Sequence, residues 1–239
     1  MRIVTVPCLK DNFAYLVIDG SAAAVVDPSE APPIDAVCER EGATLTAIWL
    51  THHHWDHVGG VQSLRSSHPG IEVVAHGIDA AKLGHAVVTR EVEQGSTVAI
   101  GTASATIVHN PGHTLGAISF HIAADDDQPG AIFTGDTLFG GGCGRIFEGT
   151  PEMMYSSLMK FSTLPSATRV YFGHEYTAAN LAFAAVAEPN NSAIARRAVQ
   201  LEIPSTPSTI ELELATNPFL RAGGAEHFRE LRSWKDRYR

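Results

Sequence analysis

The chain has 239 residues, 44% of them hydrophobic and 18% charged, which is ordinary for a globular protein with a sizeable apolar core. Its formal net charge of −9 argues against general affinity for nucleic acid or for an anionic membrane, because both require a basic surface. Three widely spaced cysteines without a CxxC pair, and a start with charge and proline too early for a secretory segment, predict a cytoplasmic protein.

The first part of the chain alternates short β-rich runs with short helical ones. Helices are expected over 32–41, closed by Gly42, and over 61–67. Strands are expected where β-branched and aromatic residues run between turn signals, at 1–6, 13–19, 22–27, 43–50, 71–75, 105–109, 117–123, 131–135 and 169–173.

The later part of the chain is mostly helical. Thr150 and Pro151 predict the start of a helix that runs to Phe161, with threonine as N-cap and proline in the first turn. After the last strand, helices are expected over 178–186, over 192–201 and after Gly224, with a proline- and serine-rich connector at 204–208. Strands followed by helices predict a β-rich domain over 1–165 and a small helical domain over 166–239.

Charge is distributed unevenly along the chain. Residues 221–239 carry six basic and three acidic side chains, a net charge of +3, so the preceding residues carry −12. A basic end on an acidic protein is a candidate site for an anion, although a solvated charged helix face is the commoner explanation.

A histidine-rich segment follows the strand expected at 43–50. Its sequence is Thr-His-His-His-Trp-Asp-His, and three adjacent histidines beside an aspartate are hard to explain by packing. His52 and His54 are two residues apart, so in an extended segment they point to the same side. Asp56 and His57 follow as the chain turns towards a helix. This loop can therefore offer two ligands to each of two neighbouring metal ions.

Three further polar residues stand at turns or strand ends, namely His113, Asp136 and His174. Taken singly, such a histidine is more often a surface or core residue, and such an aspartate more often caps a turn or a helix. Taken jointly with the loop at 52–57, five histidines and two aspartates form the donor set of a two-metal site with an open position for water. The other histidines are expected on the surface or in packing roles: His53, His68, His76, His85, His109, His121 and His227.

The pattern at 52–57 resembles the metallo-β-lactamase superfamily, an α/β fold in which an αββα sandwich holds metals at the edge of two facing sheets. Other motifs narrow the resemblance to glyoxalase II, the hydroxyacylglutathione hydrolases, which add a small C-terminal helical domain. They are DNFAYLV (11–17), NPGHT (110–114), FTGDTLF (133–139), GCGRIFEG (142–149), GHEYT (173–177), NPFLR (217–221) and LRSWKD (231–236).

The resemblance implies seven metal ligands and two catalytic carboxylates, Asp56 and Asp136. One ion would be bound by His52, His54 and His113, and the other by Asp56, His57 and His174, with Asp136 bridging the two. Zinc is the ion expected first, although this donor set also accepts iron or manganese.

The same resemblance implies that glutathione is held by Arg145, Tyr176, Arg232 and Lys235. Some members of the family carry lysine and tyrosine where this chain has Arg145 and Phe147. Arginine can still pair with an anion, even bidentately. Phe147, however, offers no hydroxyl to a substrate.

The implied activity is hydrolysis of the thioester of S-(2-hydroxyacyl)glutathione, such as S-lactoylglutathione, in methylglyoxal detoxification. The resemblance implies that a hydroxide bridging two metal ions would attack the carbonyl, and a metal-bound water has a pKa near 7, so such a hydroxide would be available at neutral pH. The leaving thiolate, from a thiol of pKa about 8.5, departs without prior protonation. An amide nitrogen needs a positioned acid, and the absence of an obvious one beside the motifs favours a thioester.

Three alternatives remain at this stage. One is a glutathione persulfide dioxygenase of the same fold, which would bind one iron and consume oxygen. Another is a metal-dependent nuclease of the superfamily, which would require a broad basic surface. The third is a non-catalytic metal-binding module with a closed coordination shell. We expect a monomer that acts on a small molecule, with no nucleic-acid or membrane partner.

Overall fold

The computed structural model describes residues 1–84 and 86–238, so the expectation for His85 and the charge of Arg239 lie outside the described residues. The chain divides into two compact units. Unit 1 comprises Met1–His109 and Gly116–Ile122, and unit 2 comprises Asn110–Leu115 and Ala123–Arg239. The division predicted near residue 165 stays a prediction.

Unit 1 contains a mixed sheet of six strands in the order in which they occur along the chain. The first three pair antiparallel through tight turns, and the last three run parallel to their neighbours, so each needs a longer connection. The strands are β1 (Arg2–Cys8), β2 (Asn12–Asp19), β3 (Ala22–Val26), β4 (Thr44–Trp49), β5 (Glu72–His76) and β6 (Arg90–Val92).

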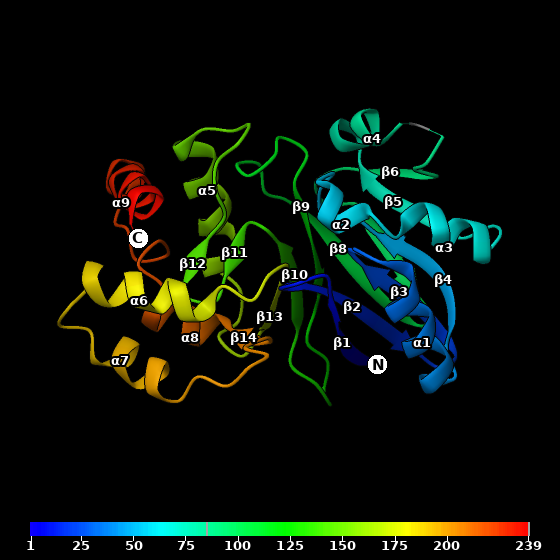
Figure 1. The fold of residues 1–239 in the computed structure, drawn as a ribbon, viewed down its shortest axis with the longest axis horizontal. Coiled ribbons are helices and arrows are strands. Elements are labelled where there is room, and N and C mark those ends of the chain that lie inside the picture. Colours follow the sequence, from blue (N-terminus) through cyan, green and yellow to red (C-terminus); the bar gives the residue numbers. More distant parts are fainter. Residues whose placement is uncertain (85, 239) are drawn as a thin grey trace. The chain divides into compact units, whose positions relative to one another are not determined.

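Helices α1 (Ala31–Glu41), α3 (Val61–Ser67) and α4 (Gly77–Leu83) supply these connections and cover one face of the sheet (Figure 1). Gly42 ends α1 in the left-handed region, at a φ of 63°, where a residue without Cβ is favoured. The core beneath these helices is apolar and includes Leu16, Ile34 and Leu64.

Strands β7 (Thr97–Ile100), β8 (Ala103–His109) and β9 (Ile118–Ile122) form an antiparallel meander in unit 1. β7 contacts β2 and β3, so the six-stranded sheet is covered on its second face too. Trp49 and Phe120 stack there with ring centroids 5.2 Å apart. This double cover explains why β2 is buried along almost its whole length, without the alternation of a half-exposed strand.

Unit 2 begins with a small strand layer. β10 (Ala131–Gly135) pairs parallel with β13 (Arg169–Phe172), which pairs antiparallel with β14 (Ser208–Thr209). β11 (Leu138–Phe139) and β12 (Gly142–Cys143) form a short hairpin. Helix α5 (Pro151–Ser162) starts as expected, since the Thr150 hydroxyl accepts the Met153 N–H at 3.3 Å.

The remaining helices of unit 2 are α6 (Thr177–Ala187), α7 (Ser192–Val199), α8 (Ile210–Thr216) and α9 (Ala225–Arg237). Helix α9 packs along α5 (Figure 1). Phe219 contacts Phe183 and Phe228, with ring centroids 6.0 and 5.7 Å apart, and all three rings are fully buried. A compact aromatic core therefore supports the helical region.

The longer elements expected from the sequence are confirmed within a few residues of their predicted bounds. The shorter ones were missed, because two to seven residues give too little periodicity: α2 (Trp55–Val58), α4, α8, β6, β7, β11, β12 and β14. Within the two described ranges, no helix combines the length and the apolarity that crossing a membrane demands.

Candidate metal centre

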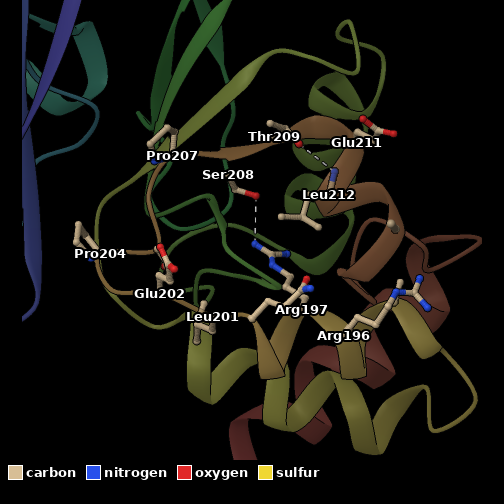
Figure 2. A pocket seen from close by; sticks show the side chains of 14 residues that line it. Arg196, Arg197, Leu201, Glu202, Pro204, Pro207, Ser208, Thr209, Glu211 and Leu212 are labelled. Carbon is tan, nitrogen blue, oxygen red and sulfur yellow. Dashed lines mark hydrogen bonds between the residues drawn. The ribbon is translucent and has the colours of Figure 1, made fainter.

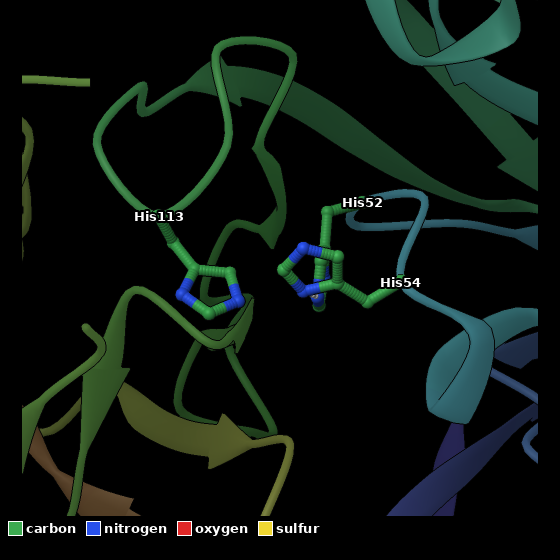
Figure 3. Close-up of side chains that lie close together, drawn as sticks. All are labelled: His52, His54 and His113. Atoms are coloured by element: carbon green, nitrogen blue, oxygen red, sulfur yellow. Dashed lines mark hydrogen bonds between the residues drawn. The ribbon is translucent and has the colours of Figure 1, made fainter. Parts of the chain in front are cut away.

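The loop after β4 carries the histidine-rich segment of unit 1. His52 Nε2 lies 3.1 Å from His54 Nδ1, and the two rings meet edge to face with centroids 4.7 Å apart (Figure 3). His113, the third side chain that Figure 3 labels, belongs to unit 2. Two imidazole nitrogens that face each other from alternate positions of one loop are suited to binding a common cation.

His57 is almost fully buried and is oriented by Asp27, a residue that the sequence analysis did not select. His57 Nδ1 donates to Asp27 Oδ2 at 3.0 Å, while the N–H and hydroxyl of Thr51 donate to the same carboxylate at 2.8 and 2.5 Å. Metal-binding histidines commonly donate their second ring N–H to a carboxylate in this way, which leaves Nε2 as the ligand atom. An aspartate at the end of a strand, before Pro28, was the available signal.

Asp56 lies in the first turn of α2 and is fixed by Asn12. The Asn12 amide donates to the Asp56 backbone oxygen at 3.0 Å and to its Oδ2 at 3.2 Å. That same Oδ2 lies 3.9 Å from His57 Nε2. The two ligand atoms expected from Asp56 and His57 are therefore neighbours, and Asn12 is a second supporting residue that the sequence did not reveal.

His53, between the expected ligands, is used differently. Its Nδ1 lies 3.1 Å from Oδ2 of the buried Asp79. The expectation that His53 is not a ligand stays a prediction. Two other histidines expected in supporting roles, His76 and His109, stack on each other with centroids 4.4 Å apart.

In unit 2, Asp136 faces two imidazoles. Its Oδ2 lies 3.5 Å from His113 Nε2 and 3.4 Å from His174 Nε2, and both histidines are buried. Two ligand atoms about 2.1 Å from one tetrahedral ion lie about 3.4 Å apart, so these separations fit ligands that share an ion better than they fit hydrogen bonds. The donor set and its spacing therefore suit zinc or a similar divalent ion.

The ring of His113 is held by the backbone of the segment after β12. Its Nδ1 donates to the Arg145 carbonyl at 2.8 Å, which leaves Nε2 to face Asp136. His174 stacks on Tyr176, with ring planes 2° from parallel and centroids 4.8 Å apart. The imidazoles of His113 and His174 are thus each oriented by a neighbour from unit 2.

The four residues expected to hold glutathione all lie in unit 2, in different environments. Arg145 and Tyr176 are exposed. Lys235 Nζ donates to the Ala179 carbonyl at 3.1 Å, and burial together with the nearby Arg232 lowers the pKa of its ammonium group. Arg232 is only 6% exposed, and its guanidinium donates to the Cys143 carbonyl and to Asp236. Phe147 is 61% exposed and rests its ring against His113.

All three cysteines are buried and free of disulfides. Burial raises the pKa of the Cys8 and Cys38 thiols to about 11, and it also raises the pKa of Cys143. None of the three is a nucleophile poised for neutral pH, which supports the expectation that they have structural roles.

A hollow of about 640 Å³ opens elsewhere in unit 2, between α7, α8 and the connector that joins them (Figure 2). On its wall, Arg197 donates to Glu213 at 2.6 Å and to the Ser208 hydroxyl at 3.1 Å. Its lining includes none of the side chains expected to bind metal or glutathione. We therefore attribute the buried ion pair to the structure of the helical region.

Comparison with known proteins shows the family to which the chain belongs. Residues 10–174 match the family model of the metallo-β-lactamase superfamily, and residues 175–238 match that of the hydroxyacylglutathione hydrolase C-terminus. The chain belongs to the hydroxyacylglutathione hydrolases. Within this family it is 41% identical to the protein named hydroxyacylglutathione hydrolase cytoplasmic of Arabidopsis thaliana and 44% identical to a hydroxyacylglutathione hydrolase of Gloeobacter violaceus. Both alignments cover 100% of each chain.

Solved structures show the same fold. ETHE1 from Myxococcus xanthus superposes with a TM-score of 0.74 at 24% identity, over 98% of this chain and 90% of the other. TTHA1623 in a di-iron-bound form superposes with a TM-score of 0.64 at 28% identity, over 92% of this chain and 100% of the other. The predicted fold, a metallo-β-lactamase α/β fold with a C-terminal helical domain, is confirmed.

Proposed function

We propose that the protein hydrolyses the thioester of S-(2-hydroxyacyl)glutathiones such as S-lactoylglutathione, giving glutathione and a 2-hydroxy acid. One observation carries the proposal: relatives that align over their full length bear the name of this activity. The match of residues 175–238 to the hydroxyacylglutathione hydrolase C-terminus supports it, because that segment belongs to this family within the wider superfamily. The cellular role would be methylglyoxal detoxification.

We assign the metal ligands as the sequence suggested. Unit 1 would contribute His52, His54, Asp56 and His57, and unit 2 would contribute His113, His174 and the bridging Asp136. The spacing of nitrogen and oxygen atoms within each unit supports this assignment. Zinc is proposed as the resident ion, and iron and manganese suit the same donors. When bound, two such ions supply a water of lowered pKa and polarise the thioester carbonyl.

The protein's own groups keep the ligands in the correct protonation state. Asp27 accepts the Nδ1 proton of His57, and the Arg145 carbonyl accepts that of His113, so the Nε2 lone pair of each ring is available. No proton donor has to be assigned for the leaving group, because a glutathione thiolate is stable enough to depart unprotonated. The role of these protein groups is therefore to position and orient the metal ligands, and not to transfer protons.

We propose that glutathione's carboxylates are recognised by Arg145, Tyr176, Arg232 and Lys235. The exposed guanidinium of Arg145 and the terminal cations of α9 support this, since they lie on an otherwise acidic chain. The protein would act as a cytoplasmic monomer without nucleic-acid or membrane partners. The cytoplasmic location is supported by the name of the Arabidopsis relative.

The test is a paired assay on one purified sample: hydrolysis of S-lactoylglutathione and metal content by elemental analysis. We expect turnover with about two metal equivalents per chain. Full activity with one equivalent would exclude the two-ion assignment. Oxygen consumption with glutathione persulfide, in place of thioester hydrolysis, would establish the dioxygenase alternative instead.

A further inference from the structure

The β11–β12 hairpin of unit 2 is bound residue by residue by side chains of the C-terminal helices. Four consecutive backbone groups take part, each with a different partner. Asn180 of α6 donates to the Gly140 oxygen at 3.1 Å, and Glu213 of α8 accepts the Gly141 N–H at 2.8 Å. Asn217 donates to the Gly142 oxygen at 2.9 Å, and Arg232 of α9 donates to the Cys143 oxygen at 2.9 Å.

All four of these side chains are buried, with Asn217 directly following α8, and the fit around the hairpin is close. A Cβ at position 142 would lie 2.5 Å from the side chain of Asn180, and one at position 140 would overlap Thr177. Buried hydrogen bonds are costly to lose because the remaining partner stays desolvated. The helices therefore fix the position of the hairpin with little freedom to shift.

The chain leaving the hairpin passes directly over two expected metal ligands. A Cβ at Gly144 would overlap the backbone oxygen of Asp136 and would lie 3.2 Å from His113 Nδ1. The Gly144 N–H donates to the Thr137 oxygen at 3.3 Å, beside Asp136. The next residue, Arg145, supplies the carbonyl that holds the His113 ring. The carbonyl bound by Arg232 and the carbonyl bound by His113 thus belong to residues only two positions apart, Cys143 and Arg145.

From these contacts we infer that Arg232 is a positioning residue for the metal centre: through Cys143–Arg145, α9 sets the orientation of His113 and the place of Asp136. The guanidinium of Arg232 is suited to this role because it is 6% exposed, lies over the Phe219 ring at 5.2 Å and bonds Asp236. The inference rests on the proposed function only for the assignment of His113 and Asp136 as ligands.

The experiment measures zinc affinity by competition with a chromophoric chelator, alongside steady-state kinetics on S-lactoylglutathione. Arg232→Met removes the donor to Cys143, and Asn180→Ala removes the donor to Gly140 from a residue with no proposed part in binding glutathione. Each is expected to weaken zinc binding about tenfold and to lower kcat, as for loss of groups that orient ligands. In Asn180→Ala, KM should change less than about twofold, whereas Arg232→Met should also raise KM because Arg232 is proposed to bind glutathione. Arg232→Lys, which keeps one donor, should recover most of the affinity.

Arg229→Met is the matched control, because Arg229 lies on the same helix and pairs with Glu152 and Glu226 instead of the hairpin. It should match the unsubstituted protein. Unchanged zinc affinity in both Arg232→Met and Asn180→Ala would overturn the inference, even if KM rose for the first. If Arg232→Met does not fold, Arg232→Lys and Asn180→Ala decide the comparison. Absence of metal binding or hydrolysis in the unsubstituted protein would instead contradict the proposed function.

Discussion

The two units present their metal-binding side chains in different ways. In unit 1 the four expected ligands lie within six residues of one loop, and a buried side chain, Asp27, orients His57. In unit 2 the three ligands come from separate turns and strand ends, and a backbone carbonyl orients His113. Ligands in one loop can be oriented by a single buried side chain such as Asp27. Ligands from separate segments depend instead on how the strands and turns that carry them are positioned. We therefore expect the two sets to respond differently to substitution.

The largest effect is expected for Asp136→Ala in unit 2. Asp136 faces both His113 and His174 through one oxygen, so no neighbouring ligand can replace it. Turnover should fall by at least about 100-fold in protein loaded with excess metal. The fold should survive, which circular dichroism would show. Normal turnover in a metal-replete Asp136→Ala protein would show that Asp136 is not a metal ligand.

Asp27→Asn tests the anchor of unit 1. Asp27 accepts three hydrogen bonds from Thr51 and His57, and an amide cannot accept at both of its terminal atoms. We expect metal affinity to fall about 10-fold and stability to fall by about 1–3 kcal/mol, measured by chelator competition and urea unfolding. Asp35→Asn is the control, because Asp35 pairs with His68 away from the ligands. Equal losses in both variants would show that Asp27 has no special role.

A smaller effect is expected for Lys235→Ala, which separates recognition from metal binding. Lys235 lies three residues after the buried Arg232 on α9 and is itself only partly buried. Its ammonium group lies over the Tyr238 ring, 5.7 Å from the ring centroid. Losing one charge-assisted contact should raise KM for S-lactoylglutathione about 3- to 10-fold, with kcat and metal content little changed. A small neutral thioester should show no such change. Equal losses on both substrates would remove Lys235 from glutathione recognition.

The smallest effect is expected for Phe147→Tyr, which restores a hydroxyl that some family members carry. Phe147 is largely exposed and its ring contacts His113. The added hydroxyl would therefore lie in solvent, close to the expected metal ligand His113. We expect KM for the glutathione thioester to fall by about twofold at most, because exposed neutral hydrogen bonds contribute little. A tenfold change in KM would show that the hydroxyl position belongs to the binding site.

The metal ligands of unit 1 were easier to predict from the sequence than those of unit 2. The loop at 52–57 was recognisable because its ligands are adjacent in sequence and follow an apolar strand. His113, Asp136 and His174 became candidates only as a set, since each is an ordinary turn residue when taken alone. Asp27 and Asn12 were missed, because a single aspartate or asparagine near a strand carries no signal for the distant residue it contacts.

The burial of Arg232 shows a second limit. The sequence places several cations on α9, and nothing in their spacing distinguishes the one that turns inward. Its partner, Cys143, is 89 residues away, in a hairpin too short and too rich in glycine to predict. Most of the longer strands and helices were predictable for the opposite reason, because their apolar residues repeat with a regular period, although α4 and α8, each of seven residues, were missed.

Asp27 also has a backbone conformation of its own, with a φ of 49° in a region where residues with a Cβ are uncommon. Holding a non-glycine residue there costs about 1 kcal/mol, which glycine at the same position would avoid. The fold tolerates this strain at a site where the side chain is needed to orient His57. Glycine at position 27 would relieve this strain, but it would also remove the acceptor of three buried hydrogen bonds, two from Thr51 and one from His57. Because losing buried hydrogen bonds costs about 1–3 kcal/mol each, the loss outweighs the strain. A screen for thermostability alone should therefore retain aspartate at position 27, although its backbone conformation favours glycine.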